Sequence, residues 1–272
     1  MAADKSEDSD SSGILSFLNR WINDILGLVF PGYLLMLLLV FVFNVFDVVE
    51  DAMTNSHPEW FAPALSIGLA YFFGNFLSGF GDRFVFRPLG WLCSWVRDNP
   101  ADAPKWLKAI GKTFVPESVS SVQALARYVA STGEFQAFRK IAREQNGIEI
   151  PDHPDMRDVR MLRSIALSST PEVNQLTTKF TFHSILNGNV ATVVLLFALA
   201  LLGYGRLWTL GHELDPKMRL FGLLICAVFF YVHALTRYEY YRRSMTTPFS
   251  GAVGSAARKQ ADAVTRPPPA AR

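Results

Sequence analysis

The chain has 272 residues, of which 50% are hydrophobic and only 18% are charged, and its net charge is +2. Soluble globular proteins average about 25% charged residues. Together with a mean hydropathy of +0.19, this composition excludes an ordinary soluble α/β enzyme. The two cysteines, Cys93 and Cys226, are far apart in the sequence and predict neither a disulfide framework nor a zinc site.

Four long segments contain no charged residue. Uncharged stretches of 22, 22, 26 and 17 residues follow Asp24, Glu59, Lys179 and Arg219. A helix of about 20 apolar residues crosses about 30 Å of hydrocarbon, and inside lipid the backbone must satisfy its own hydrogen bonds. The alternation that a β-barrel requires is absent. The sequence therefore predicts an all-α polytopic membrane protein with four transmembrane helices and a cytoplasmic helical insert between spans two and three.

The N-terminal part begins with polar residues and continues into apolar ones. Residues 1–12 are acidic and serine-rich, and we expect them to be disordered. Residues 13–26 place apolar side chains at helical spacing opposite polar ones, which predicts an interfacial amphipathic helix. The acidic leader argues against a cleavable signal peptide. Residues 27–82 then form a first transmembrane hairpin, with spans at about 27–48 and 61–81.

The insert at residues 83–179 has 14 basic and 10 acidic residues, which is an ordinary soluble composition. Its apolar residues recur at helical spacing, and we expect Thr170 to cap a long helix that leads into the second membrane hairpin at residues 180–237. The spans of that hairpin are predicted at about 184–205 and 218–236. Residues 238–272 are predicted to be a basic cytoplasmic tail that is disordered after residue 248, because Pro248 is followed by a Gly-, Ala- and Ser-rich segment.

Lysine and arginine set the orientation of the spans. The first external loop contains neither residue, whereas the insert contains 14 and the segment after Thr236 contains 7. Cytoplasmic segments carry an excess of these cations. We therefore expect a multi-pass protein of the cell (inner) membrane with both termini and the insert in the cytoplasm.

Polar and small residues inside the predicted spans are candidates for intramembrane contacts. Buried polar groups in lipid either mark an ion or proton path or hold helices together, and near the span ends we favour the second interpretation. Gly74 and Ser78 form a small-xxx-small pair, as do Ala64 and Gly68, so we expect close helix packing or a homo-oligomer through this face of span two. The candidates are Asn75, Gly74, Ser78, Asn44 and Asp47, with Asn187, Asn189 and Thr192 in span three.

Basic residues at the membrane boundary are candidate contacts for lipid headgroups: Arg83, Arg87, Arg237, Arg242 and Arg243. Juxtamembrane cations attract anionic lipids, although the topology rule alone also explains them. The cations of the insert form no stripe, so we expect no nucleic-acid partner.

No catalytic signature is visible. The sequence lacks a zinc-protease motif, a nucleophile elbow, a phosphate-binding loop and a dinucleotide fingerprint. His183 and His233 are isolated histidines, for which we favour a structural role. Loop residues His57, Glu59, His212, Glu213 and Asp215 do not follow a metal-binding spacing. We predict no catalytic residue, no metal and no cofactor.

Two short segments resemble part of a known group of proteins. The opening of span one, Pro31-Gly32-Tyr33, and the stretch Tyr71 to Ser78 of span two are similar in layout to uncharacterised bacterial four-span inner-membrane proteins with a cytoplasmic helical insert. Some of those proteins are membrane effectors of antiviral systems. The resemblance implies the layout and assigns no site or activity.

Three functions are compatible with these features. We favour a membrane protein that anchors a cytoplasmic helical module, which senses or scaffolds through a cytoplasmic protein partner. The alternative is an oligomeric channel or membrane-disrupting effector, in which polar residues line a pore. An enzyme that acts on lipid headgroups has least support, because no acid and base pair is visible.

Overall fold

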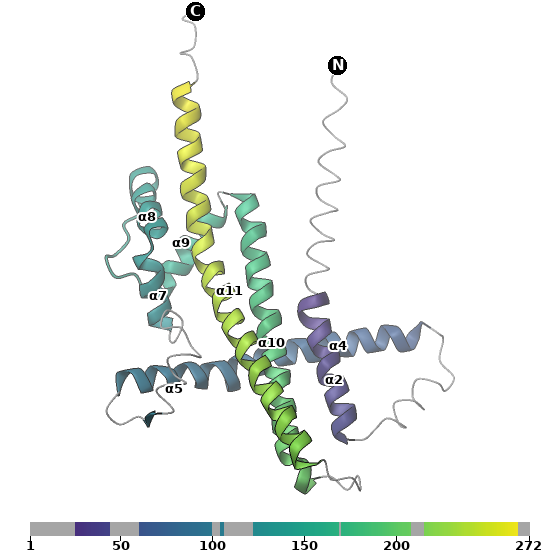
Figure 1. Cartoon of the computed structure of the whole chain (residues 1–272). Helices are drawn as coiled ribbons and strands as arrows, with labels where there is room; N and C mark the ends of the chain where they lie inside the picture. Colours follow the sequence, from purple (N-terminus) through teal and green to yellow (C-terminus); the bar gives the residue numbers. More distant parts are fainter. Residues whose placement is uncertain are drawn as a thin grey trace, which may run out of the picture. The chain divides into compact units, whose positions relative to one another are not determined.

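The computed structural model describes residues 25–43, 60–99, 104–105, 122–168, 170–207 and 215–265 (Figure 1). All regular secondary structure in these ranges is helical. The described residues fall into two units. Unit 1 comprises those within Met1–Pro88 and Phe182–Arg237, and unit 2 comprises those within Leu89–Thr181 and Tyr238–Arg272.

The helices are long and mostly apolar at the N-terminal side of the chain. A π-helix η1 (Ile25–Val29) leads directly into α2 (Phe30–Phe43), and α4 (Phe61–Phe80) continues through the π-helix η2 (Gly81–Phe86) into α5 (Arg87–Asp98). The two longest helices are α10 (Pro171–Leu207) and α11 (Pro216–Thr265), and each contributes residues to both units.

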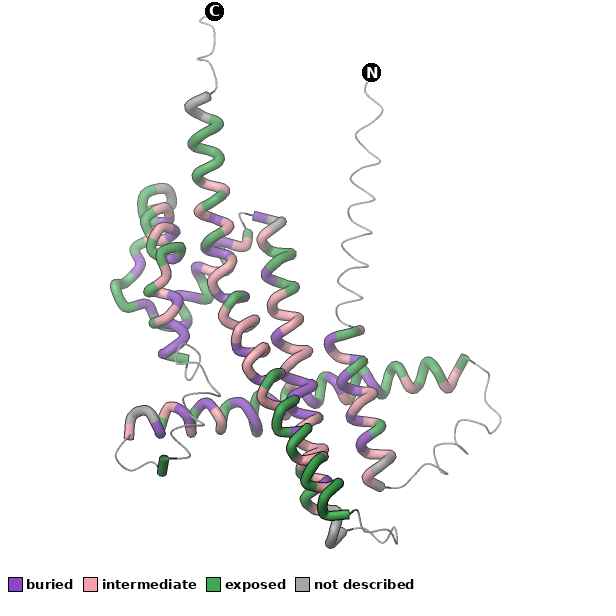
Figure 2. The backbone as a smooth tube through the Cα atoms, in the orientation of Figure 1, coloured by how far each residue is buried: buried purple, intermediate pink, exposed green. Residues whose placement is uncertain are grey.

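Three of these helical stretches are long and apolar enough to cross a membrane: Phe61–Val96, Val173–Gly203 and Pro216–Asp262. The described part of the first predicted span, Ile25–Val40, is a shorter apolar helix. The prediction of an all-helical chain with several membrane-compatible helices is therefore confirmed, and the end of the first predicted span lies outside the described residues. Figure 2 marks exposed residues along α4 and the first part of α11, where Leu224 and Val228 are among the exposed apolar side chains.

Unit 1 is held together by close backbone approach between α4 and the first helices. A methyl group on Gly32 would overlap the carbonyl of Ala70, and one on Gly74 would overlap the carbonyl of Leu28. The contacts step one turn along each helix in opposite directions. Small residues allow such approach between apolar helices, and an apolar cluster of Leu35, Leu38, Leu77 and Val193 follows it.

Unit 2 contains three short helices around an apolar core: α7 (Val122–Ser131), α8 (Gly133–Asn146) and α9 (Met156–Ser168). Thr132 caps α8, and Gly147 ends it in the left-handed conformation that glycine favours. At the start of α9, Asp155 accepts hydrogen bonds from the backbone of Arg157 and Asp158, while Asp158 accepts one from Asp155. This reciprocal cap lowers the pKa of the Asp155 carboxyl, first through its bond with Asp158.

The core of unit 2 includes residues from the C-terminal helix. Phe249 is fully buried, with its ring centroid 5.0 Å from that of Phe135 and 5.4 Å from that of Phe138. Met245 and Ala252 belong to the same cluster as Val159 and Leu162. Burial of such apolar surface favours a helix where composition alone predicts a loose tail.

The structure thus differs from the prediction of disorder after residue 248, because α11 continues to Thr265. Proline has no N–H group, so Pro248 leaves the carbonyl of Ser244 without its helical partner. Arg163 of α9 supplies that partner, since its Nε donates to the Ser244 oxygen at 3.2 Å. Burial lowers the pKa of the Arg163 guanidinium.

Two further expectations have different outcomes. Helix α10 begins at Pro171 as predicted, and the Thr170 hydroxyl donates to the Ala166 carbonyl at 3.1 Å. It therefore closes the end of α9. The predicted disordered tail at 1–12, and residues 13–24 of the predicted amphipathic helix, lie outside the described residues.

Candidate functional site

Polar side chains from η2, α10 and α11 gather in unit 1, together with Gly188 of α10. We call this set, Asp82, Ser184, Asn187, Gly188, Asn189, His233 and Arg237, the polar cluster. Its members lie in or next to helical stretches with almost no other charge. Polar groups in such surroundings require partners, because an unpaired one is costly to remove from water.

Arg237 contacts several elements of unit 1. Its guanidinium pairs with the Asp82 carboxylate and stacks 3.8 Å from the centre of the Phe86 ring. The Arg237 side chain is 18% exposed and that of Asp82 is 55% exposed. On α10, the Ser184 hydroxyl donates to the Arg237 carbonyl at 3.1 Å. Arg237 therefore joins α11 to α10 and to η2.

Gly188 lies against the Arg237 side chain. A methyl group at Gly188 would overlap the Arg237 guanidinium, which would have to shift to admit it. The Thr192 hydroxyl donates to the Gly188 carbonyl at 2.8 Å.

His233 lies one turn before Arg237 on α11. Its Nδ1 is 2.7 Å from the Asn187 amide oxygen, and the Asn187 amide nitrogen donates to the His183 carbonyl at 2.7 Å. Because that oxygen only accepts, Nδ1 carries the hydrogen. This pairing agrees with the structural role predicted for His233.

Asn189 connects the remaining helices. It is 1% exposed, and its amide nitrogen lies 3.2 Å from the Gly27 carbonyl of η1 and 3.4 Å from the Gly74 carbonyl of α4. The Asn189 amide thus bonds to the backbone of both η1 and α4. The amide therefore acts as the interhelical link that was favoured for this group.

The predicted intramembrane residues of span two separate onto two faces. Gly74 is buried against the Leu28 backbone, and the small residue that accompanies it is Ala70, which meets Gly32. Ser78 is half-buried. Asn75 is exposed, and its amide nitrogen donates to the Tyr71 carbonyl of its own helix at 3.0 Å. Asn44 and Asp47 lie outside the described residues.

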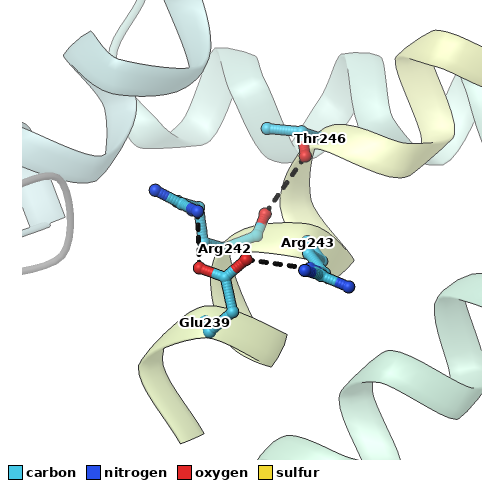
Figure 3. A network of polar contacts seen from close by, with 4 residues as sticks. All are labelled: Glu239, Arg242, Arg243 and Thr246. Carbon is cyan, nitrogen blue, oxygen red and sulfur yellow. Dashed lines mark hydrogen bonds and ion pairs between the residues drawn. The ribbon is translucent and has the colours of Figure 1, made fainter. Parts of the chain in front are cut away.

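The predicted headgroup cations also differ from one another. Arg83 and Arg87 are exposed, whereas Arg237 is in the polar cluster. Arg242 and Arg243 both pair with Glu239, at 2.5 Å and 2.9 Å (Figure 3). Burial raises the pKa of the Glu239 carboxyl, but hydrogen bonds and charges from both arginines outweigh burial and place this pKa below its ordinary value. One carboxylate thus offsets part of their charge.

The polar cluster is suited to holding helices together. Among the described residues, no three His, Cys, Asp or Glu side chains are grouped as metal ligands. The cluster pairs its cation with a carboxylate and its histidine with an amide. The sequence predicted Asn187, Asn189 and Arg237 as individual features and did not single out Asp82, although an acid and a base that border apolar spans are a detectable signal.

Comparisons with known proteins add no assignment. No protein-family model, no curated protein and no solved structure matches this chain.

Proposed function

We propose that this chain is a multi-pass protein of the cell (inner) membrane that anchors a cytoplasmic helical module. In this proposal the four apolar segments span the membrane, both termini and the insert lie in the cytoplasm, and the module senses or scaffolds a cytoplasmic protein partner. The single observation that carries the proposal is a contrast within α11. Large apolar side chains are exposed in its first part and buried in its second part.

The first part of α11 has the surface expected for contact with lipid. Phe221, Leu224 and Val228 are each about 60% exposed and no charged residue interrupts residues 220–236. A row of large, exposed apolar side chains on one helix is typical of a surface that contacts lipid or another protein. After Arg237 the apolar residues of α11 become buried, and Met245 and Phe249 lie in the core of unit 2. The helices α7–α9 around that core also carry charged residues.

The contacts of the polar cluster favour an anchor over the alternative of a channel. Asn187 and Asn189, which a pore could present to water, form hydrogen bonds with His233 and with two backbone carbonyls. Groups that are paired in this way contribute to helix association. With α4 placed in the membrane, Arg83 and Arg87 follow the end of this span, which supports their proposed contacts with lipid headgroups.

Membrane location is tested by alkaline carbonate extraction and by labelling single cysteines from either side of the membrane. We expect the chain to stay in the membrane pellet, with a cysteine at Met161 labelled from the cytoplasmic side only. Release by carbonate, or labelling of Met161 from outside, would contradict the proposed topology.

The role of the module is tested in the full chain with a photo-cross-linking residue at Val122 or Met161, both exposed on unit 2. We expect a discrete cross-linked protein from at least one of these positions. Val228 is the matched control, because it is similarly exposed but lies on the proposed lipid-facing part of α11. Equal yields from all three positions would count against a specific partner.

A further inference from the structure

The exposed face of α4 differs chemically from its packed face. Ala70, Gly74 and Leu77 are buried, and the first two meet the helices of residues 25–43. About half a turn around the helix lies an exposed set that we call the outer face: Ala64, Gly68, Phe72, Asn75, Phe76 and Gly79. It is apolar apart from one amide.

That amide is incompletely satisfied. One N–H of Asn75 donates to the Tyr71 carbonyl, which leaves the amide oxygen and the second N–H without a hydrogen bond among the described residues. In water this has no consequence. In hydrocarbon each unsatisfied polar group is costly, and a polar residue inside a membrane helix is expected to find a protein partner.

We propose that a second copy of this chain docks on the outer face, with Asn75 opposite Asn75 across a two-fold axis. A primary amide has both a donor and an acceptor and is therefore its own complement. A two-fold axis brings the same residue of each copy together, so each Asn75 oxygen accepts from the free N–H of the other. A lipid tail offers neither group.

The surroundings of Asn75 permit this approach. An added methyl group at Gly68 or at Gly79 would meet no atom of the described residues within 4 Å. These glycines lie seven residues before and four residues after Asn75, which places all three on one side of the helix. Phe72 and Phe76 flank the amide and exclude solvent once the copies are in contact. The internal contact of Gly74 does not compete, because it uses the opposite side.

The inference rests on the proposed membrane location of α4 and does not depend on what the cytoplasmic module binds. The direct test measures association of the full-length chain in phosphatidylcholine vesicles by energy transfer between labelled copies, over a range of protein-to-lipid ratios. We expect Asn75→Leu to raise the apparent dissociation constant of the dimer roughly tenfold, and Asn75→Gln to retain most of the association.

Asn174→Leu is the matched control, since Asn174 is also exposed but lies outside the outer face. We expect it to associate like the natural chain. Among the described residues the Asn75 amide bonds only within its own helix, so its replacement removes no hydrogen bond between those helices. Association that is unchanged by Asn75→Leu would overturn the inference.

Cross-linking locates the contact independently. In a background with Cys93→Ala and Cys226→Ala, a cysteine at Phe72 is expected to form disulfide-linked dimers in membranes on mild oxidation, and one at Val228 is not. Equal cross-linking at both positions would overturn the inference. A chain that carbonate releases from membranes refutes the proposed function, whereas a retained chain that does not associate refutes only this contact.

Discussion

Single residues in this protein have functions that depend on their partners more than on their type. Gly74 and Gly68 are both glycines of α4 and both lie in an apolar segment. A methyl group at Gly74 would overlap the Leu28 backbone, whereas one at Gly68 would meet no described atom within 4 Å. Asn189 and Asn75 show the same contrast, because one amide links two helices and the other is exposed.

The two glycines provide a matched prediction. Gly74→Ala is expected to lower the unfolding temperature of the detergent-solubilised chain, because the backbones of α4 and η1 must separate to admit the methyl group; overpacking of this kind costs about 1–3 kcal/mol. Gly68→Ala is expected to leave the temperature unchanged or slightly higher. Thermal denaturation followed by size-exclusion chromatography measures both. Equal losses for the two variants would show that Gly74 is not at a tight contact.

At the scale of elements, α11 shows how a helix can continue through proline. Pro248 lies inside the helix and removes one backbone hydrogen bond. Arg163 restores a donor to the Ser244 carbonyl, and Phe249 supplies buried apolar surface immediately afterwards. A local helix breaker is tolerated because a side chain from another helix replaces the missing donor.

The relation between Arg163 and Pro248 can be measured with a double-mutant cycle. Arg163→Ala is expected to destabilise unit 2 by about 1–3 kcal/mol, because it leaves the Ser244 carbonyl without a donor. In a Pro248→Ala background the backbone N–H of residue 248 can serve that carbonyl, so the same Arg163 change is expected to cost less. Amide hydrogen exchange along α9 and α11 reports both costs. An identical cost in the two backgrounds would mean that the two residues are independent.

At the scale of the whole molecule, the composition suggests a separate insert domain, but the core of unit 2 is built from two distant segments of the chain. The insert at 83–179 has the composition of a separate soluble domain, yet the core of unit 2 also contains Met245, Phe249 and Ala252. Segments that are far apart in the sequence therefore complete one core. The module extends beyond the insert to include the C-terminal part of α11.

Truncation tests this conclusion. A chain that ends after residue 247 is expected to lose amide protection throughout α7–α9, because removal of Phe249 alone deletes a fully buried ring, a change that typically costs about 3–5 kcal/mol. A chain that ends after residue 258 retains the core and is expected to keep this protection. Both variants are expected to remain in the membrane fraction, since residues 216–237 are intact. Full protection in the shorter chain would show that α7–α9 fold without α11.

Much of this protein could be predicted from local sequence patterns. Charge-free segments determine which helices can enter lipid, since each buried charge is costly. Capping residues and glycine determine where short helices end, as at Thr132 and Gly147. These features depend on neighbours in the sequence and on the solvent, so the sequence by itself determined the all-helical class, the apolar stretches and the start of α10 at Pro171.

Only the tertiary structure decided the features that join distant residues. The pairing of Asp82 with Arg237, the two carbonyls bound by Asn189, and the Ser244 carbonyl bound by Arg163 each connect residues that are 81 or more positions apart. The burial of Phe249 converts a Gly- and Ala-rich tail into helix. A hydrogen bond or an apolar contact has no signature in the sequence of one partner, because its free energy exists only when the other partner is in place.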